Sequence, residues 1–258
     1  MTLLWTIVFA FFLPFAAMAN ETGKFGAFIK DDLSAPGTVN KIADPTGSAP
    51  TSKVHAFSLP SGYCNPKKYD AGAKDSDCTW NSSRSQMRQS SKSQPKEAWY
   101  GWYTYFPPDF AYGSRQTKGH YEFAYWHNHQ CPHLSFSGGP KNDGNLYIET
   151  NKALGNYECG PRDLIKVATF KELLGHWVRF EVFVKWSNDS TGQAIVYLDG
   201  KQRAVLNGAT LTKGLESINY FKFGIYLCCT KDFRQIRGTS MLYAGVRSGG
   251  SRKDLEVN

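Results

Sequence analysis

The feature that most constrains the fold is a series of short segments in which apolar and polar residues alternate. Residues 177–186, Trp-Val-Arg-Phe-Glu-Val-Phe-Val-Lys-Trp, show it best, because Val178, Phe180 and Val182 fall on one side of an extended chain. A period of two is that of a half-buried β-strand. A helical period appears only weakly, near Ala168–Leu174. The sequence therefore predicts an all-β protein.

Turn residues separate the alternating segments at the spacing of an antiparallel sandwich. Gly138-Gly139-Pro140, Asn142-Asp143-Gly144 and Asp199-Gly200 are three such turns. No linker divides the chain, so residues 20–258 are predicted to form one antiparallel β-sandwich, a β-jelly roll of the concanavalin A-like type. The expected strands are Lys53–Leu59, Ser83–Gln89, Trp99–Phe106, Tyr121–His129, Leu134–Ser137, Asn145–Asn151, Trp177–Trp186, Gln193–Leu198, a short return strand after Asp199-Gly200, Tyr220–Tyr226 and Met241–Val246.

Residues 1–19 resemble a secretory signal peptide. Leu3–Ala17 is almost wholly apolar, and Ala17-Met18-Ala19 has the small-x-small form of a cleavage site. A membrane anchor is the rival interpretation, but the run is short for a spanning helix and Pro14 interrupts it. We expect a secreted protein that has no membrane partner once the leader is removed.

The six cysteines fit an oxidising compartment. Cys64 with Cys78 is the first pairing we predict, because the two bracket a loop rich in Lys, Asp and Gly; Cys131 with Cys159 is the second. Cys228 and Cys229 would then need a vicinal bridge or other partners. Paired C-x-x-C units are missing, which argues against a structural zinc site.

The formal charge of +8 favours a polyanionic partner: an acidic polysaccharide, nucleic acid or an anionic surface. The aromatic content of 15% suits either polymer, since aromatic rings serve both sugar faces and bases. No nucleic-acid-binding module is recognisable, so an acidic polysaccharide is the preferred partner.

Three of the predicted strands carry chemically suggestive side chains on one face. Strand parity places together three groups: Arg84, Gln86 and Arg88; Tyr125, His127 and His129; and Tyr220, Lys222 and Tyr226. The last group sets a cation between two phenols, a surface typical of a groove for an acidic sugar chain.

The histidines also raise the question of a metal, since His127 and His129 form an H-x-H pattern with His133 nearby. No carboxylate is evident close by to complete a set of ligands, and Cys131 is expected to be oxidised. We therefore predict no metal and no cofactor.

The three strands together resemble a known enzyme family. Arg84-Ser-Gln-Met-Arg88 is similar to the R-S/T-E-L-R strand of the jelly-roll alginate lyases, Tyr125-Trp-His127 to their Q-I-H strand, and Tyr220–Tyr226 to their Y-F-K-x-G-x-Y strand, in the same order. The sequence before and between these strands, including Asp77-Cys78 and residues 99–110, is closer to that of the heparin lyase I-like and glucuronan lyase-like group. The resemblance covers most of residues 50–250.

That resemblance implies a lyase that cleaves a uronic-acid-containing polysaccharide by β-elimination. By position, Tyr226 matches the catalytic tyrosine, His127 the histidine that serves as base or charge neutraliser, and Arg84 and Arg88 the arginine strand. Lys222 would lower the pKa of the Tyr226 phenol and bind substrate charge. The remaining predicted substrate-binding residues are Gln86, Tyr125, His129 and Tyr220.

Two departures keep alternatives open. Tyr125 replaces the glutamine of Q-I-H, and Gln86 replaces a glutamate, so Gln86, Asn128 or another residue must neutralise the substrate carboxylate, or activity is lost. A non-catalytic, lectin-like β-sandwich is therefore the alternative function. A glycoside hydrolase would need two carboxylates about 5–10 Å apart, and the usual E-x-D-x-x-E strand is missing. We expect a monomer.

Overall fold

We describe the protein from a computed structural model, in which residues 27–69, 74–91, 93–110, 112, 119–138, 143–151 and 162–257 are placed. The described residues form fourteen strands and three short 3₁₀ helices. The strands are β1 (Phe28–Lys30), β2 (Val39–Ala43), β3 (Lys53–Leu59), β4 (Ser83–Gln89), β5 (Glu97–Tyr105), β6 (His120–His127), β7 (Pro132–Gly138), β8 (Asn145–Asn151), β9 (Arg162–Thr169), β10 (Trp177–Lys185), β11 (Gln193–Leu198), β12 (Lys201–Asn207), β13 (Tyr220–Cys228) and β14 (Thr239–Gly249). The helices are η2 (Phe170–Glu172), η3 (Phe233–Gln235) and η4 (Arg252–Leu255).

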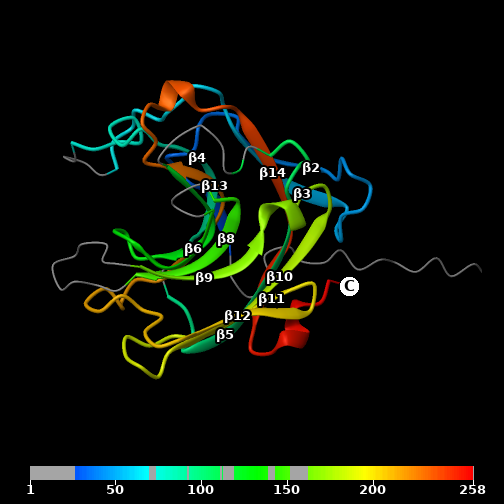
Figure 1. The fold of residues 1–258 in the computed structure, drawn as a ribbon, viewed down its shortest axis with the longest axis vertical. Helices are drawn as coiled ribbons and strands as arrows, with labels where there is room; N and C mark the ends of the chain where they lie inside the picture. The colour runs from blue at the N-terminus through cyan, green and yellow to red at the C-terminus, as the bar shows by residue number, and fades with distance from the viewer. Residues whose placement is uncertain are drawn as a thin grey trace, which may run out of the picture.

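The strands form two antiparallel sheets of seven strands each, as predicted for a jelly-roll sandwich (Figure 1). Sheet A has the order β1-β4-β13-β6-β7-β8-β9, and sheet B the order β12-β11-β10-β5-β14-β3-β2. Sheet A is strongly curved, so one of its faces is concave (Figure 1). The predicted site strands β4, β13 and β6 lie side by side in this sheet.

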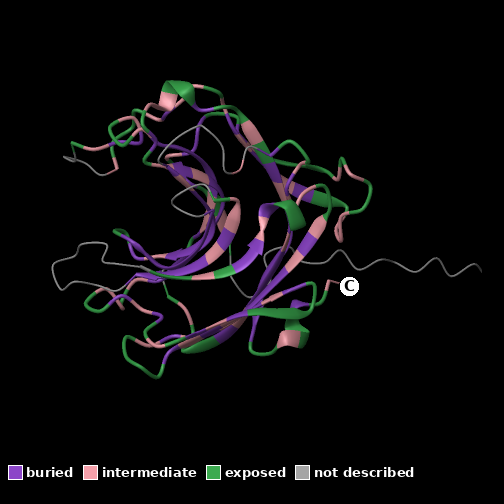
Figure 2. Cartoon of the chain, in the orientation of Figure 1, coloured by how far each residue is buried: buried purple, intermediate pink, exposed green. Residues whose placement is uncertain are grey.

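The core lies between the two sheets and is rich in aromatic rings. From β13, Phe221 and Phe223 point inward and are fully buried, packing against Trp102 and Phe57 of sheet B at 5.6 Å and 5.5 Å between ring centroids. Aromatic pairs at such distances add about 0.5–1.5 kcal/mol to the free energy gained by burial alone. Figure 2 shows the buried residues running along the strands of both sheets. The core therefore fixes which face of β13 remains outside.

An irregularity in the pairing of β13 with β6 sets the geometry of the outer face. The register shifts between Phe223 and Tyr226, so that Tyr226 lies opposite Glu122. Gly224 has φ +131°, and a Cβ atom there would lie 2.3 Å from the carbonyl oxygen of Ser85. Only glycine fits this position, because the backbones of β13 and β4 approach too closely for a side chain.

Most predicted strands are confirmed, and four agree with the structure at both ends: Lys53–Leu59, Ser83–Gln89, Asn145–Asn151 and Gln193–Leu198. Strands β1, β2 and β9 were not among the predicted strands. The weakly helical stretch near Ala168–Leu174 contains the end of β9 and the single turn η2. The apolar period there arises because Ala168, Phe170 and Leu173 all reach the core.

The cysteines follow the prediction where the structure describes them. Cys64 and Cys78 are joined, and Cys228 is bonded to its neighbour Cys229. Cys131 is also disulfide-bonded. Its predicted partner, Cys159, lies outside the described residues, so that pairing stays a prediction.

The predicted leader, residues 1–19, likewise lies outside the described part of the chain, so it stays a prediction. Within that part, no helix has the length and apolar character that crossing a bilayer requires.

Candidate active site

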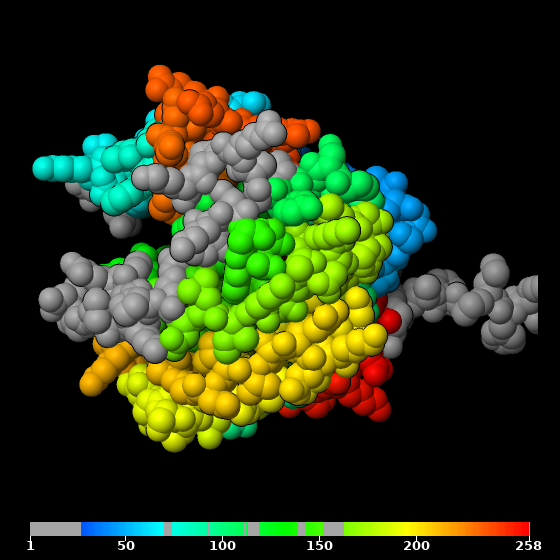
Figure 3. All heavy atoms as spheres, viewed as in Figure 1, coloured from blue at the N-terminus to red at the C-terminus, as the bar shows by residue number. Residues whose placement is uncertain are grey.

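The three strands that carry the suggestive side chains form the centre of the outer face of sheet A. Two rows of paired residues cross them, Arg88–Lys222–Tyr125 and Arg84–Tyr226–Glu122. Directly paired residues in neighbouring strands present their side chains on the same face. The structure thus brings the predicted arginine, lysine and tyrosine residues together. Figure 3 shows a hollow in the molecular surface beneath the cyan segment that precedes β4.

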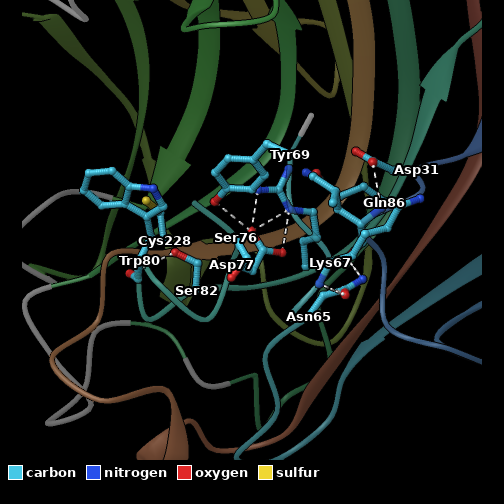
Figure 4. A network of polar contacts seen from close by, with 12 residues as sticks. Asp31, Asn65, Lys67, Tyr69, Ser76, Asp77, Trp80, Ser82, Gln86 and Cys228 are labelled. Carbon is cyan, nitrogen blue, oxygen red and sulfur yellow. Dashed lines mark hydrogen bonds and ion pairs between the residues drawn. The ribbon is translucent and has the colours of Figure 1, made fainter. Parts of the chain in front are cut away.

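Arg84 is held by a carboxylate that lies outside the three strands. Its guanidinium donates to Asp77 from Nε to Oδ2 at 2.9 Å and from Nη2 to Oδ1 at 2.6 Å, and both side chains are buried. The hydroxyl of Tyr69 donates to the same carboxylate at 3.1 Å, and Figure 4 shows Tyr69 and Asp77 turned toward each other. The Cys64–Cys78 disulfide ties down the loop that carries both residues. Arg84 is therefore a paired, fixed cation.

Lys222 is compensated in the same way. Its ammonium forms an ion pair with Asp31, which follows β1, and both groups are buried. Burial alone would raise the pKa of Asp31, but the charges of Lys222 and Arg84 hold it well below its ordinary value. Burial lowers the pKa of Lys222, and the carboxylate of Asp31 opposes that shift. Lys222 is thus part of the floor beneath the site.

Gln86 and Tyr125 form a third buried contact in this floor. The Tyr125 hydroxyl donates to Oε1 of Gln86 at 2.7 Å, and both side chains are almost completely buried. Burial raises the pKa of Tyr125 well above its ordinary value, so its hydroxyl remains a neutral donor. Within the described part of the chain, Nε2 of Gln86 has no hydrogen-bond partner. Tyr125, which replaces the family glutamine, therefore orients another amide on the neighbouring strand.

Tyr226 lies above this floor and is only half-buried. The guanidinium carbon of Arg84 lies 4.2 Å from the centre of its ring. Burial raises the pKa of Tyr226 above its ordinary value, and the charge of Arg84 opposes the shift only in part. The expected lowering of this pKa by Lys222 is wrong on two counts, because the pKa is raised and Arg84 is the cation against the ring. The free protein therefore presents a neutral phenol at neutral pH.

His127 is half-buried and lies across β13 from the arginine strand. Its Nδ1 accepts a hydrogen bond from the backbone N–H of His129 at 2.9 Å. The Tyr220 hydroxyl lies 3.2 Å from the same nitrogen and 3.4 Å from Nδ1 of His129. Burial and the charges of Lys222 and Arg84 hold the pKa of His127 well below its ordinary value. A neutral ring whose Nδ1 is an acceptor carries its proton on Nε2.

Arg88 is the predicted site cation whose charge no carboxylate of the described residues neutralises. It is half-buried at the edge of the site, next to Lys222 in the row of paired residues. Among the described residues it forms no ion pair with a carboxylate. A guanidinium in this state is suited to bind a carboxylate through two parallel hydrogen bonds.

Three carboxylates that the sequence did not indicate as site residues lie among these groups. Asp31 and Asp77 neutralise the two buried cations. Glu122 lies opposite Tyr226, and its Oε1 is 3.6 Å from Nε2 of His120. Of the three, Asp77 alone lies in a short segment, Asp77-Cys78, that contributed to the family resemblance in the sequence. In the described ranges, no group of three or more His, Cys, Asp or Glu side chains is arranged to hold a metal ion.

The curved antiparallel sandwich, with phenol, imidazole and guanidinium groups gathered on one sheet, defines a jelly-roll protein with a polar candidate site. Comparison with protein families identifies the family of this chain. The profile described as "Polysaccharide lyase" matches residues 30–243, and the chain belongs to that family. A search of curated proteins gave no significant match.

Solved structures share the fold at low sequence identity. An endo-β-1,4-glucuronan lyase from the fungus Trichoderma reesei superposes with a TM-score of 0.62 at 16% identity, over 89% of this chain and 93% of that chain. An alginate lyase of polysaccharide lyase family 7 gives 0.50 at 13%, over 88% and 95%. A GH131 β-glucanase catalytic domain from Podospora anserina gives 0.50 at 12%, over 84% and 82%. Because the β-glucanase has a different chemistry on a similar fold, function must be argued from the site.

Proposed function

We propose that this polysaccharide lyase cleaves a uronic-acid-containing polysaccharide by β-elimination. The proton on C5 of a uronate is too weakly acidic to be removed while the adjacent carboxylate keeps its full charge. Donors that neutralise this carboxylate stabilise the enolate-like intermediate. A base must then take the C5 proton, and an acid must protonate the departing O4. The outer face of sheet A offers groups for each task.

Arg88 and His127 are the proposed carboxylate-binding groups. Arg88 is accessible and holds a charge that no carboxylate of the described residues compensates, whereas Arg84 and Lys222 are already paired. The Nε2–H of neutral His127 adds a second donor on the other side of β13. Removing one such donor from an active site typically slows a reaction by about 10²–10³-fold.

Tyr226 is the proposed proton-transfer residue, and Arg84 its positioning residue. In its phenolate form Tyr226 takes the C5 proton; the C–H electron pair then forms the C4–C5 double bond as the C4–O4 bond breaks. The new phenol donates the same proton to O4. The products are one fragment whose new non-reducing end is the unsaturated uronate and another whose new reducing end keeps O4 as its anomeric hydroxyl, and Tyr226 returns to its starting state.

This arrangement favours glucuronate or mannuronate over guluronate. In the first two sugars, H5 and O4 lie on the same side of the ring, so one residue can serve both atoms. Guluronate places them on opposite sides and needs a second proton-accepting group. His127 is poorly suited to that role, because its Nδ1 already accepts the N–H of His129 and its Nε2 carries the proton.

The disulfides, together with the leader predicted from the sequence, support action outside the cell, where acidic polysaccharides of walls and matrices are found. The net charge of +8 fits a polyanionic substrate. We therefore extend the proposal to a secreted lyase whose partner is a glucuronan-like or alginate-like chain.

The observation that carries the proposal is the half-buried phenol of Tyr226 held 4.2 Å above the paired guanidinium of Arg84. The test is to incubate the purified protein with glucuronan, polymannuronate, polyguluronate and heparin, and to follow the ultraviolet absorbance of the unsaturated uronate. A rise with glucuronan or polymannuronate, and little with polyguluronate, is expected. Binding without any rise on the whole panel would instead support the lectin-like alternative.

A further inference from the structure

Trp80 stands out as the most exposed tryptophan of the described residues. Half of its surface, 51%, is open to solvent, whereas the core indoles of Trp102 and Trp126 are 2% and 0% exposed. A single exposed apolar side chain is common on protein surfaces and needs a second observation before it suggests a site. In this case there are two: the rigidity of its support and its place beside the candidate active site.

The backbone of Trp80 is fixed on both sides. Its N–H donates to the carbonyl of Ser76 at 3.3 Å, and the hydroxyl of Ser82 donates to the carbonyl of Trp80 at 3.2 Å. The Cys64–Cys78 disulfide closes the loop two residues earlier. The exposed indole is therefore presented by a tight, cross-linked turn.

The same turn is bonded to the end of β13. The N–H and the hydroxyl of Thr230 both donate to the carbonyl of Asn81, at 3.1 Å and 2.7 Å. The N–H of Cys229 donates to Oγ of Ser82 at 3.0 Å. Cys229 is itself bonded to Cys228, so two disulfide-linked segments brace each other beneath the indole.

This support lies directly beside the proposed reacting group. Cys228 follows Tyr226 by two residues in β13 and shares its outward face, at about 6.8 Å along the strand. Asp77, the partner of Arg84, precedes Trp80 by three residues. Figure 4 shows Trp80 and Cys228 together at one end of the polar network, with Tyr69 and Asp77 next to them.

We propose that Trp80 is a stacking platform for a sugar ring adjacent to the one cleaved at Tyr226. The inference rests on the proposed function, because it needs a polysaccharide lying over the outer face of sheet A. A pyranose has an apolar C–H face that matches the flat face of an indole, and burying this aromatic surface supplies binding free energy. Because the turn is already rigid, binding costs little additional ordering of the protein.

The platform predicts a length dependence that the catalytic groups alone would not produce. A fragment that occupies only the cleavage position misses Trp80, whereas a longer one reaches it. Replacing Trp80 should therefore weaken binding of long oligosaccharides and leave the shortest ones unaffected.

The experiment measures binding of glucuronate and of glucuronan oligosaccharides of two to six residues to Tyr226→Phe protein, which is expected to bind without cutting, by calorimetry. Adding Trp80→Ala should weaken binding of the longest fragments roughly tenfold, corresponding to about 1.4 kcal/mol, with no change for the monosaccharide. Trp80→Phe should restore much of the affinity. Leu164→Ala is the control, since Leu164 is another exposed apolar residue (40%), on β9 at the opposite edge of the sheet.

Equal affinity of the Trp80→Ala and parent proteins for every length would overturn the platform, and so would a lack of binding by both. Cleavage by the wild-type protein is assayed in parallel. Normal cleavage with no effect of Trp80→Ala would refute the platform and leave the proposed function intact. If the wild type cuts no uronan, the proposed function fails, and the binding series still decides the role of Trp80.

Discussion

Arg84 and Tyr226 face each other across β4 and β13, with the guanidinium carbon 4.2 Å from the centre of the phenol ring. The guanidinium cannot turn away, because Asp77 accepts hydrogen bonds from both its Nε and Nη2. The arrangement gives Tyr226 a fixed positive charge on one face of its ring. Within the arginine strand, Arg84 is therefore fixed in position by its carboxylate, and Arg88 is the arginine that we propose to bind the substrate.

Replacing Asp77 by Asn should therefore affect both stability and activity. The buried guanidinium of Arg84 would lose its counter-charge, and removing one partner of a buried ion pair typically costs about 3–5 kcal/mol of unfolding free energy. Denaturant unfolding measures this loss, and steady-state kinetics should show a lower kcat. Asp75→Asn, two residues away in the same loop, is the control and should change neither. Unaltered stability of Asp77→Asn would mean that the pair is not maintained in solution.

Replacing Tyr226 by Phe should abolish turnover while the fold is preserved. The substitution removes the only atom that carries the transferred proton and keeps the ring against Arg84. Loss of general acid–base catalysis is expected to lower kcat by at least about 10²–10⁴-fold, with little change in oligosaccharide affinity. The absorbance assay gives the rate and circular dichroism verifies the fold. A kcat near that of the wild type would assign proton transfer to another residue.

The pH dependence of the wild type tests whether Tyr226 is both base and acid. Burial raises its pKa above the ordinary value for tyrosine; the charge of Arg84 opposes that shift, and the charges of Asp77 and of Glu122 on β6 add to it. If the catalytic cycle begins from the phenolate of Tyr226, only a small fraction of the enzyme molecules is in the active protonation state at neutral pH. The value of kcat/KM should then rise about tenfold per pH unit on the alkaline side until it approaches that pKa. A phenol acting only as an acid would give the opposite, a fall at high pH.

Strand parity predicts correctly which residues share the outer face in a regular strand and fails in an irregular one. Parity correctly places Arg84, Gln86 and Arg88 on one face of β4, because that strand is regular. In β6, parity counted from Tyr125 would place Phe123 outward. The irregular pairing there sends Phe123 and Ala124 both into the core and brings Glu122 to the outer face.

The carboxylates that neutralise the buried cations could not be predicted from the sequence, for a different reason. Asp31 lies 191 positions before Lys222 in the chain, and only the pairing of β1 with β4 brings it to the site. No local pattern marks such a contact. Tyr226, by contrast, could be singled out because the aromatic and polar residues that mark its face all lie within its own strand.

Substitutions of His127 should distinguish a donor from a base. Gln places an amide N–H near the position of Nε2 but cannot accept a proton, and Ala offers neither function. If His127 neutralises the carboxylate, His127→Gln should keep at least about ten times more kcat/KM than His127→Ala on glucuronan, within the range expected for a single donor. Equal inactivity of both variants would point to His127 as the base. His176, exposed and remote in sequence, is the control position.

The ion pair of Asp31 with Lys222 should appear in the acid stability of the protein. Because the folded-state pKa of Asp31 is depressed, the pair stabilises the fold above the unfolded-state pKa of about 3.9. This contribution is lost as the pH falls below that value toward the folded-state pKa. Asp31→Asn removes it at every pH and leaves Lys222 buried without its partner. At pH 7 the variant should therefore be less stable by about 3–5 kcal/mol.

The difference between wild type and Asp31→Asn should stay constant from about pH 5 to 8 and shrink below about pH 4, as the wild type protonates its own carboxylate. Asp32→Asn is a matched control next to it, because among the described residues the ion pair of Asp32 is an exposed one, with Lys67 at 3.8 Å. Such surface pairs are worth about 0–1 kcal/mol. Urea unfolding at a series of pH values measures all three proteins. A difference that persists undiminished at pH 2 would show that Asp31 stabilises the fold through contacts other than its charge.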